Sequence, residues 1–469
     1  MSPGVEVLTA VDSARQQRAF AGALIRRGVV AGDRVALHTI SGGRMLSAIL
    51  GALRIGVVPV LLNRGLLDEE REALTTTAEP ALVVDDTLLL SMLDAGFTTD
   101  LAPHPLARPM HFTSGTTGVP KGVWSGVLTE REAEGLAQEE AELWGFDAAD
   151  RHLVCSPFHH SVSIRFGGGT LLAGGSVVIP GPFDASIARS ALRELRPTTT
   201  FMVPAHLQRL LAMPSSAGQA DAPSGALRHD LRSLRLLVHA GAPCPAALKH
   251  RVLDLVGPDR LWEFYGSTEG QFTACSGREW VHRPGTVGRG RAHRSLHTDD
   301  DGTIWCTVPA YGRFEYWRDP VKTAAAWREA DGGGRSFTVG DLGRLDDDGY
   351  LFIEGRRDDL IITGGVNVYP AEIEAVLARA PGVAEVAVFG VDDERWGQRV
   401  CAAVRSRGTD LPTADLSGSV IAHARAHLAP YKCPKEVFVV DELPLTATGK
   451  VQRLRLPGLL GLAPTPTQT

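Results

Sequence analysis

The segment from Thr113 to Gly122 has the residue types of a phosphate-binding loop. It reads TSGTTGVPKG and directly follows a short apolar run. Its glycines allow the backbone to approach an anion closely, its hydroxyl groups can donate hydrogen bonds, and Lys121 adds a positive charge. Pro120 stands where a Walker A loop, G-x-x-x-x-G-K, requires its second glycine, so this loop belongs to another class. On composition alone, a flexible surface loop is the alternative.

Apolar runs that alternate with helical segments must position this loop. The spacing of apolar residues predicts a helix over 11–27, a strand at 34–38, a helix near 44–54 and a strand at 56–62. Similar apolar runs lie at 81–84, 176–179, 198–203 and 234–238. Buried parallel strands have this appearance, so the expected fold class is α/β. The stretch 215–225, rich in Ser, Ala, Gly and Pro, is expected to form an exposed loop.

A domain boundary is expected near 355–358, where a charged stretch follows a hairpin-like run at 343–353 that turns at Asp348-Gly349. Helical patterns then follow at 371–380 and 416–428, and strand patterns at 383–389, 400–404 and 436–440. We therefore predict an N-terminal domain of residues 1–357 and a small α+β domain of residues 358–469. The tail after Gly461 has little to bury and is expected to be disordered.

Length, charge and cysteine content restrict the class of protein. A chain of 469 residues exceeds the size of one hydrophobic core, so at least two domains are expected. The net charge of −6 and the lack of a basic block argue against nucleic acid as a partner. No apolar stretch is long enough for a membrane span and no signal-peptide pattern begins the chain, so a cytoplasmic location is expected. The six cysteines form no C-x-x-C pair, which predicts buried free thiols rather than a zinc site or disulfides.

Together with later motifs in the chain, the loop resembles the signature of the ANL superfamily, which contains acyl-CoA synthetases, adenylation domains and firefly-type luciferases. These motifs are EFYGSTE at 263–269, GD at 340–341, GRRDDLI at 355–361, GGVNVYPAEIE at 364–374 and PLTATGK at 444–450. The similarity extends from about residue 20 to about residue 455. The segments SPFHH at 156–160, HAGAPCP at 239–245 and PYKCP at 430–434 resemble most closely the fatty-acyl and aryl-acyl CoA synthetase branch.

The resemblance implies a large N-terminal adenylate-forming domain with layered sheets and helices, plus a small mobile α+β C-terminal domain. Asp358 would be the hinge of a rotation that follows adenylation. The rotation would withdraw Lys450 and bring the acceptor channel at Gly364 and Gly365 to the site. Before it, the point charge of Lys450 would meet the α-phosphate and the attacking oxygen. Without the resemblance, Lys450 is an ordinary exposed lysine on a turn.

The resemblance also implies an ATP site with Mg²⁺. Its ATP-binding residues would be Thr113, Ser114, Gly115, Thr116, Thr117, Gly118, Lys121, Gly241, Ala242, Pro243, Tyr265, Gly266, Thr268, Asp341, Arg356 and Lys450. Tyr265 offers a flat face for adenine, and Asp341, with Arg356 as a neighbouring donor, suits the ribose hydroxyls. Glu269 is an oxygen ligand of the kind that Mg²⁺ prefers. Taken singly, a core tyrosine, a loop aspartate and a solvated glutamate are the ordinary alternatives.

Catalysis and acid binding complete the expected site. Lys450, Thr268, Glu269 and His159 would be catalytic, with Thr268 bonded to the α-phosphate. The acid pocket would contain His159, His160, Arg165, His239, Gly266 and Gly270. His159 corresponds to a histidine at the edge of the acyl pocket in related ligases, although a hydrogen-bonded core histidine is the alternative. Arg165 could bind an acidic group of a substrate or simply pair with a carboxylate of the protein, and the sequence leaves this open.

Three uses of the chemistry remain open. The default for this branch is formation of an acyl-AMP and its transfer to CoA. The regions before Thr113 and from Gly290 to Tyr316 are short for the family, which favours a small aromatic or short-chain acid. Some natural-product enzymes of the same fold instead adenylate nitrite and pass it to an arylamine as diazotases, and others load a carrier protein. The oligomeric state does not follow from the sequence.

Overall fold

Contacts divide the chain into two compact units, each with its own core. The computed structural model describes residues 4–40, 42–63, 66, 68–113, 121–213, 223–330, 333–356, 359–363, 366–393, 396–408, 413–445 and 451–462. Unit 1 consists of Met1–Leu296, Cys306–Val339 and Asp347–Leu351, and unit 2 of His297–Trp305, Gly340–Asp346 and Phe352–Thr469. The boundary predicted between residues 357 and 358 falls outside the described residues and stays a prediction.

One sheet of unit 1 has six strands in the order β16-β6-β5-β3-β2-β4. Their bounds are β16 Glu315–Tyr316, β6 Lys121–Trp124, β5 Met110–Thr113, β3 Val58–Leu61, β2 Arg34–His38 and β4 Leu82–Asp85. Strand β2 pairs in parallel with β3 and β4, and β3 with β5, whereas β6 runs antiparallel to both β5 and β16. The short β5–β6 pair flanks the loop at 114–120, which lies outside the described residues.

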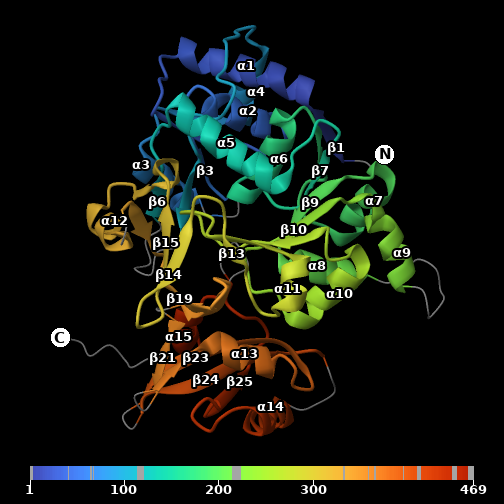
Figure 1. The fold of residues 1–469 in the computed structure, drawn as a ribbon, viewed down its shortest axis with the longest axis vertical. Coiled ribbons are helices and arrows are strands. Elements are labelled where there is room, and N and C mark those ends of the chain that lie inside the picture. Colours follow the sequence, from blue (N-terminus) through green and yellow to red (C-terminus); the bar gives the residue numbers. More distant parts are fainter. Residues whose placement is uncertain are drawn as a thin grey trace. The chain divides into compact units, whose positions relative to one another are not determined.

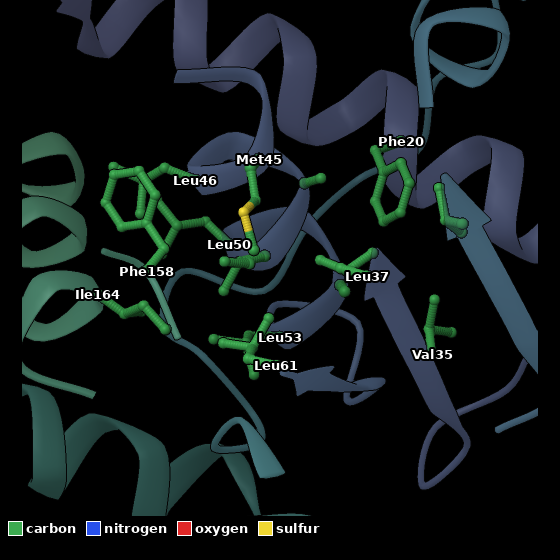
Figure 2. Packing of buried hydrophobic residues seen from close by; sticks show 14 of the residues in the cluster. Phe20, Val35, Leu37, Met45, Leu46, Leu50, Leu53, Leu61, Phe158 and Ile164 are labelled. Carbon is green, nitrogen blue, oxygen red and sulfur yellow. The ribbon is translucent and has the colours of Figure 1, made fainter. Parts of the chain in front are cut away.

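The apolar core of this part of unit 1 is built around α2 (Gly43–Leu53), a helix with almost every residue buried. Figure 2 shows Met45, Leu46 and Leu50 of this helix near Phe158 and Ile164, residues of the same buried cluster. Helix α1 (Ala10–Arg26) packs against both α2 and α4 (Asp86–Asp94) (Figure 1). A Cβ at Gly51 would lie 2.5 Å from the carbonyl oxygen of Gln17, so only glycine allows this close approach.

The second sheet of unit 1 has eight strands in the order β1-β8-β7-β9-β10-β11-β12-β13. Their bounds are β1 Glu6–Thr9, β8 Ser176–Ile179, β7 Arg151–Val154, β9 Thr199–Met202, β10 Leu236–His239, β11 Leu261–Glu263, β12 Thr273–Ser276 and β13 Arg289–Gly290. The five strands from β8 to β11 in this order pair in parallel. Its associated helices are α6 Ser161–Leu172, α7 Ala185–Leu195, α8 Pro204–Leu211, α9 Pro223–Asp230 and α10 Ala246–Val256.

Unit 1 also contains helix α5, strands β17 and β18, and residues 306–308 of β15. Helix α5 (Glu130–Trp144) begins with a capping box between Thr129 and Glu132 and ends at Gly145, which is left-handed with φ 60°. Strand β15 (Ile304–Val308) pairs through residues 306–308 with β18 (Arg335–Phe337), which pairs with β17 (Trp327–Glu329).

Unit 2 is a small α+β domain. Its sheet has the order β22-β21-β24-β23, and β25 adds to β24. The bounds are β21 Ile361–Thr363, β22 Val366–Val368, β23 Val383–Asp393, β24 Gly397–Ser406 and β25 Glu436–Val439, with helices α13 Pro370–Leu377 and α14 Thr413–His427. Strands β19 (Asp341–Leu345) and β20 (Leu351–Arg356) form a separate two-stranded sheet.

The structure confirms the α/β class and most of the predicted elements, with one correction. Residues 223–225, predicted as loop, begin helix α9, because Pro223 stands at its start and proline is well suited to the first helical turn. The tail after 462 lies outside the described residues. All six cysteines are free, five of them buried and Cys244 partly exposed. In the part of the chain that was described, no helix has the length and apolarity of a membrane span.

Candidate active site

Two neighbouring parallel strands of the eight-stranded sheet end side by side at the candidate site. In the register of β10 and β11, His239 lies opposite Glu263. Beyond these residues the chain leaves the sheet as the loops 240–245 and 264–272. Open α/β sheets bind ligands at the carboxyl ends of their strands. Strand pairing therefore brings together the predicted nucleotide residues Gly241–Pro243 with Tyr265, Gly266 and Thr268, and residues 241–243 are exposed.

The loop after β11 is a tight turn that only glycine permits. A Cβ at Gly266 would lie 2.8 Å from both the Gly270 carbonyl oxygen and Cα of Gln271. The Ser267 amide donates to the Gly270 carbonyl at 2.8 Å, and Gly266 bridges to Gln271. One face of the Tyr265 ring stacks on Phe272, with centroids 4.8 Å apart. The turn thus fixes the direction of Tyr265 and the position of Thr268.

Glu269 is held by a tyrosine from the other sheet. The Tyr316 hydroxyl donates to Glu269 Oε1 at 2.8 Å, and the Glu269 residue is 5% exposed. Among the described residues, no group of three or more His, Cys, Asp or Glu side chains could hold a metal ion. A Mg²⁺ ion at Glu269 would therefore take its remaining oxygen ligands from phosphate and water, which suits the usual habit of this ion.

Lys121 begins β6, directly after the loop that was predicted to bind phosphate. Its Nζ lies 3.0 Å from Asp319 Oδ2. The backbone hydrogen bond that Asp319 accepts from Lys322 is the main cause of its lowered pKa, and the Lys121 side chain lowers this pKa further. Thr113 ends β5, whereas the predicted phosphate ligands at 114–118 lie outside the described residues.

His159 and His160 lie in the loop before α6, half-buried, with ring centroids 4.3 Å apart. Burial, assisted by His160 and His111, lowers the pKa of His159 to about 3. Burial likewise lowers the pKa of His111 on β5 to about 4. His159 is thus neutral at physiological pH and would act there as a hydrogen-bonding group rather than a cation.

His239, predicted in the acid pocket, is a fully buried side chain with 0% exposure. Its Nδ1 lies 3.8 Å from Glu263 Oε1, and Lys249 of α10 forms an ion pair with Glu263 Oε2. Burial raises the pKa of Glu263, and Lys249 opposes that rise. His239 is therefore buried beneath the loop 240–245, and its contact with the acid stays a prediction.

Arg165 joins a buried charged network between α5, α6 and the loop after β13. Its Nη1 donates to Gln271 Oε1 at 2.6 Å, and its Nε lies 3.5 Å from Glu140 Oε2. Arg291 Nη1 donates to Glu140 at 2.7 Å and to Gln271 Oε1 at 3.0 Å. Arg291 Nε lies 2.9 Å from Glu139, which Arg294 also contacts. Although burial opposes it, Arg165 and Arg291 lower the pKa of Glu140.

In unit 2, Asp341 begins β19 with 6% exposure, and Gly340 before it is left-handed with φ 79°. Arg356 ends β20. The predicted hinge Asp358, the acceptor glycines Gly364 and Gly365, and Lys450 lie outside the described residues. Arg453, which follows Lys450 closely, donates to Glu374 Oε2 at 2.7 Å and to Asp359 Oδ2 at 3.0 Å.

Sequence reasoning missed several residues of this arrangement. They are Tyr316, Asp319, Lys249, Glu139, Glu140, Arg291 and Arg294. Lys249 carried a signal, because it shares one face of α10 with the buried Val252 and Val256, and a lysine on an apolar face is unusual. Tyr316 carried none, since β16 has only two residues.

Comparison with known proteins identifies relatives over nearly the whole chain. A model of the AMP-binding enzyme family matches residues 4–303, and a model of the AMP-binding enzyme C-terminal domain matches residues 372–450. The chain is 31% identical to an indoleacetate–CoA ligase of Aromatoleum aromaticum, over 92% of this chain and 89% of that protein.

Solved structures give the same picture. ATP-bound MatB from Rhodopseudomonas palustris is 28% identical, with a TM-score of 0.81 over 96% of this chain and 93% of that one. The amide bond synthetase McbA from Marinactinospora thermotolerans is 26% identical, with a TM-score of 0.78 over 96% of this chain and 95% of that one.

Proposed function

Since the chain belongs to the ANL superfamily of adenylate-forming enzymes, in its acyl- and aryl-CoA ligase branch, and is an ATP-dependent ligase, we propose which substrates it joins. It activates a small carboxylic acid, aromatic or short-chain, as an acyl-AMP with release of pyrophosphate. It then transfers the acyl group to the CoA thiol.

The proposal rests on the pairing of β10 with β11. This pairing places the exposed backbone of Gly241–Pro243 beside the turn that carries Tyr265 and Glu269. Adenine binds between the Tyr265 ring and this backbone, while Thr268 donates to the α-phosphate. A preorganised donor at that position stabilises charge that develops during adenylyl transfer.

Two charged groups of unit 1 complete the proposed phosphate site. Glu269 holds Mg²⁺, which would offset the negative charge of the triphosphate when bound. Lys121 lies at the end of the loop 114–120 and supplies a positive charge, which Asp319 keeps in place. Lys450 acts on the α-phosphate, and Asp341 binds the ribose.

The decisive experiment is a pyrophosphate-release screen of carboxylic acids and nitrite with ATP and Mg²⁺, each with and without CoA. Arylamines form a further arm, because the structurally similar McbA is an amide bond synthetase. We expect carboxylic acids to release pyrophosphate and CoA to convert the adenylate to a thioester. AMP formation that requires nitrite and ignores CoA would replace the proposal by the diazotase reaction. Acyl transfer to amines alone would keep the activation step and change the acceptor.

A further inference from the structure

The charged network around Arg165 contains more positive than negative charge. We call Arg165, Arg291, Arg294, Glu139 and Glu140 the guanidinium cluster. It has three guanidinium groups and two carboxylates, and the side chains of Arg291, Arg294 and Glu139 are only 2%, 6% and 2% exposed. An unmatched charge in a buried position is unfavourable unless a partner compensates it.

A fourth guanidinium increases the imbalance. Burial lowers the pKa of Arg108 to about 10, and the nearby positive charges of Arg294 and Arg165 contribute to this shift. Its Nη2 donates to the backbone carbonyl of Arg313 at 2.7 Å, and its buried Nε has no hydrogen-bond partner among the described residues. Arg291 Nη2 is also buried without such a partner there. These groups would be stabilised by an additional negative charge.

Arg165 is the member of the cluster that a ligand can reach. Its side chain is 23% exposed, far more than those of Arg291 and Arg294. Glu140 and Gln271 engage its Nε and Nη1, and the guanidinium lies 5.4 Å from the ring centroid of Phe264. Within the described residues, its Nη2 makes no hydrogen bond. Arg165 Nη2 is therefore a donor available to a ligand, and the contacts of Nε and Nη1 fix its direction.

The position of this donor links it to the acid site. Gln271, which accepts from Arg165, bridges to Gly266 in the turn that leads to Thr268 and Glu269. Phe264 belongs to the same loop after β11. Arg165 thus contacts the turn that carries Thr268 and Glu269 through Gln271, and the start of the same loop through Phe264.

We propose that Arg165 binds a second carboxylate at the far end of the acid, so that this enzyme selects dicarboxylic acids. This inference rests on the proposed function and specifies its substrate class. One carboxylate of the diacid attacks the α-phosphate and the other accepts a charge-assisted hydrogen bond from Arg165 Nη2. The bound anion would balance the excess charge of the guanidinium cluster.

The test compares each diacid with its monomethyl ester, which keeps the shape and one carboxylate but removes the second charge. Glutarate, adipate and isophthalate and their half-esters are assayed by pyrophosphate release with the wild-type protein. For at least one diacid, we expect kcat/KM to exceed that of its half-ester about 10- to 100-fold, as for a hydrogen bond to a charged group. A ratio near one for every pair would overturn the inference without any variant, while activity with the half-esters would leave the proposed function intact.

Variants then assign the preference to Arg165. Arg165→Gln should lose about 10- to 100-fold with the preferred diacid and change little with its half-ester. Arg165→Lys should keep part of the preference, because it retains the charge. Arg15→Gln is the matched control, since Arg15 is 77% exposed and pairs with the nearby Asp12. Equal losses for diacid and half-ester in Arg165→Gln would make Arg165 a structural residue. Failure of every acid to release pyrophosphate in the wild-type protein would instead reject the proposed function.

Discussion

Glu269 illustrates what a motif can and cannot reveal about one residue. The stretch EFYGSTE pointed to its carboxylate as a magnesium ligand, but not to the group that holds it. That group is the hydroxyl of Tyr316, which lies 47 positions further along and reaches Glu269 because β16 pairs with β6. A contact made by a two-residue strand leaves no periodic pattern in the sequence. The motif therefore carries a prediction for the chemistry of Glu269, whereas its contact with Tyr316 is seen only in the fold.

Replacing Glu269 with Gln should separate these two roles. The amide keeps the shape and can still accept from Tyr316, but it loses the charge that would attract Mg²⁺. We expect the rate of adenylate formation to fall on the order of 10²-fold and the Mg²⁺ requirement to rise. Tyr316→Phe, which removes only the hydroxyl, should cost less and leave the Mg²⁺ requirement nearer that of the wild type. An unchanged Mg²⁺ titration for Glu269→Gln would remove this residue from the metal site.

At the scale of elements, predictions succeeded where a periodic pattern was long enough. The predicted strand at 34–38 and the helices near 11–27 and 44–54 agree with β2, α1 and α2 to within a residue or two. No prediction covered the strands β15, β17 and β18. Each of these strands has three to five residues and lies in a region of loops. Strands this short gain their stability from neighbours such as Phe314 and Trp327, whose rings are 5.0 Å apart, and not from local propensity.

The ion pair beneath β10 and β11 gives a prediction at this scale. Lys249 is 2% exposed and pairs with Glu263, so Lys249→Met leaves the carboxylate buried without its cation. We expect the free energy of unfolding to fall by about 3–5 kcal/mol, and the KM for ATP to rise because the adjoining loops carry the proposed nucleotide site. Adding Glu263→Gln should recover part of the stability, since the unpaired charge is then absent. Urea denaturation of the single and double variants checks this, and strictly additive losses would show that the two side chains are not coupled.

The whole molecule consists of two units, and the domain boundary predicted from the sequence stays a prediction. The charged stretch at 355–358 suggested a boundary there, and unit 2 does contain the α+β elements expected after it. Unit 2 also includes His297–Trp305 and Gly340–Asp346, which come from before the expected boundary. Such membership depends on long-range contacts, among them the bond from the Gly343 amide to the Gly302 carbonyl at 2.9 Å. Local sequence patterns do not predict long-range contacts of this kind.

Buried histidines should make the stability of unit 1 fall in mild acid. Burial lowers the pKa of His152 to about 3 and that of His111 to about 4, whereas an unfolded histidine titrates near 6.5. Below pH 6.5 the unfolded chain therefore binds protons that the folded chain does not, so stability decreases as pH falls toward 4. Each such histidine should contribute a slope of about 1.4 kcal/mol per pH unit between pH 6 and 5.

The contribution of one histidine to this pH dependence can be measured by making the same His→Gln substitution at two positions. His152 is 1% exposed, and its Nδ1 lies 3.0 Å from the Thr199 hydroxyl, an interaction that a glutamine can replace. His152→Gln should reduce the pH dependence of the free energy of unfolding by about one proton, even if the variant is less stable at every pH. His229→Gln, at an exposed position on α9, is the matched control for the substitution itself. The measurement is urea denaturation at intervals from pH 7 to 5. Equal slopes for the wild type and His152→Gln would mean that His152 takes up its proton in the folded protein, in spite of its burial against Phe166.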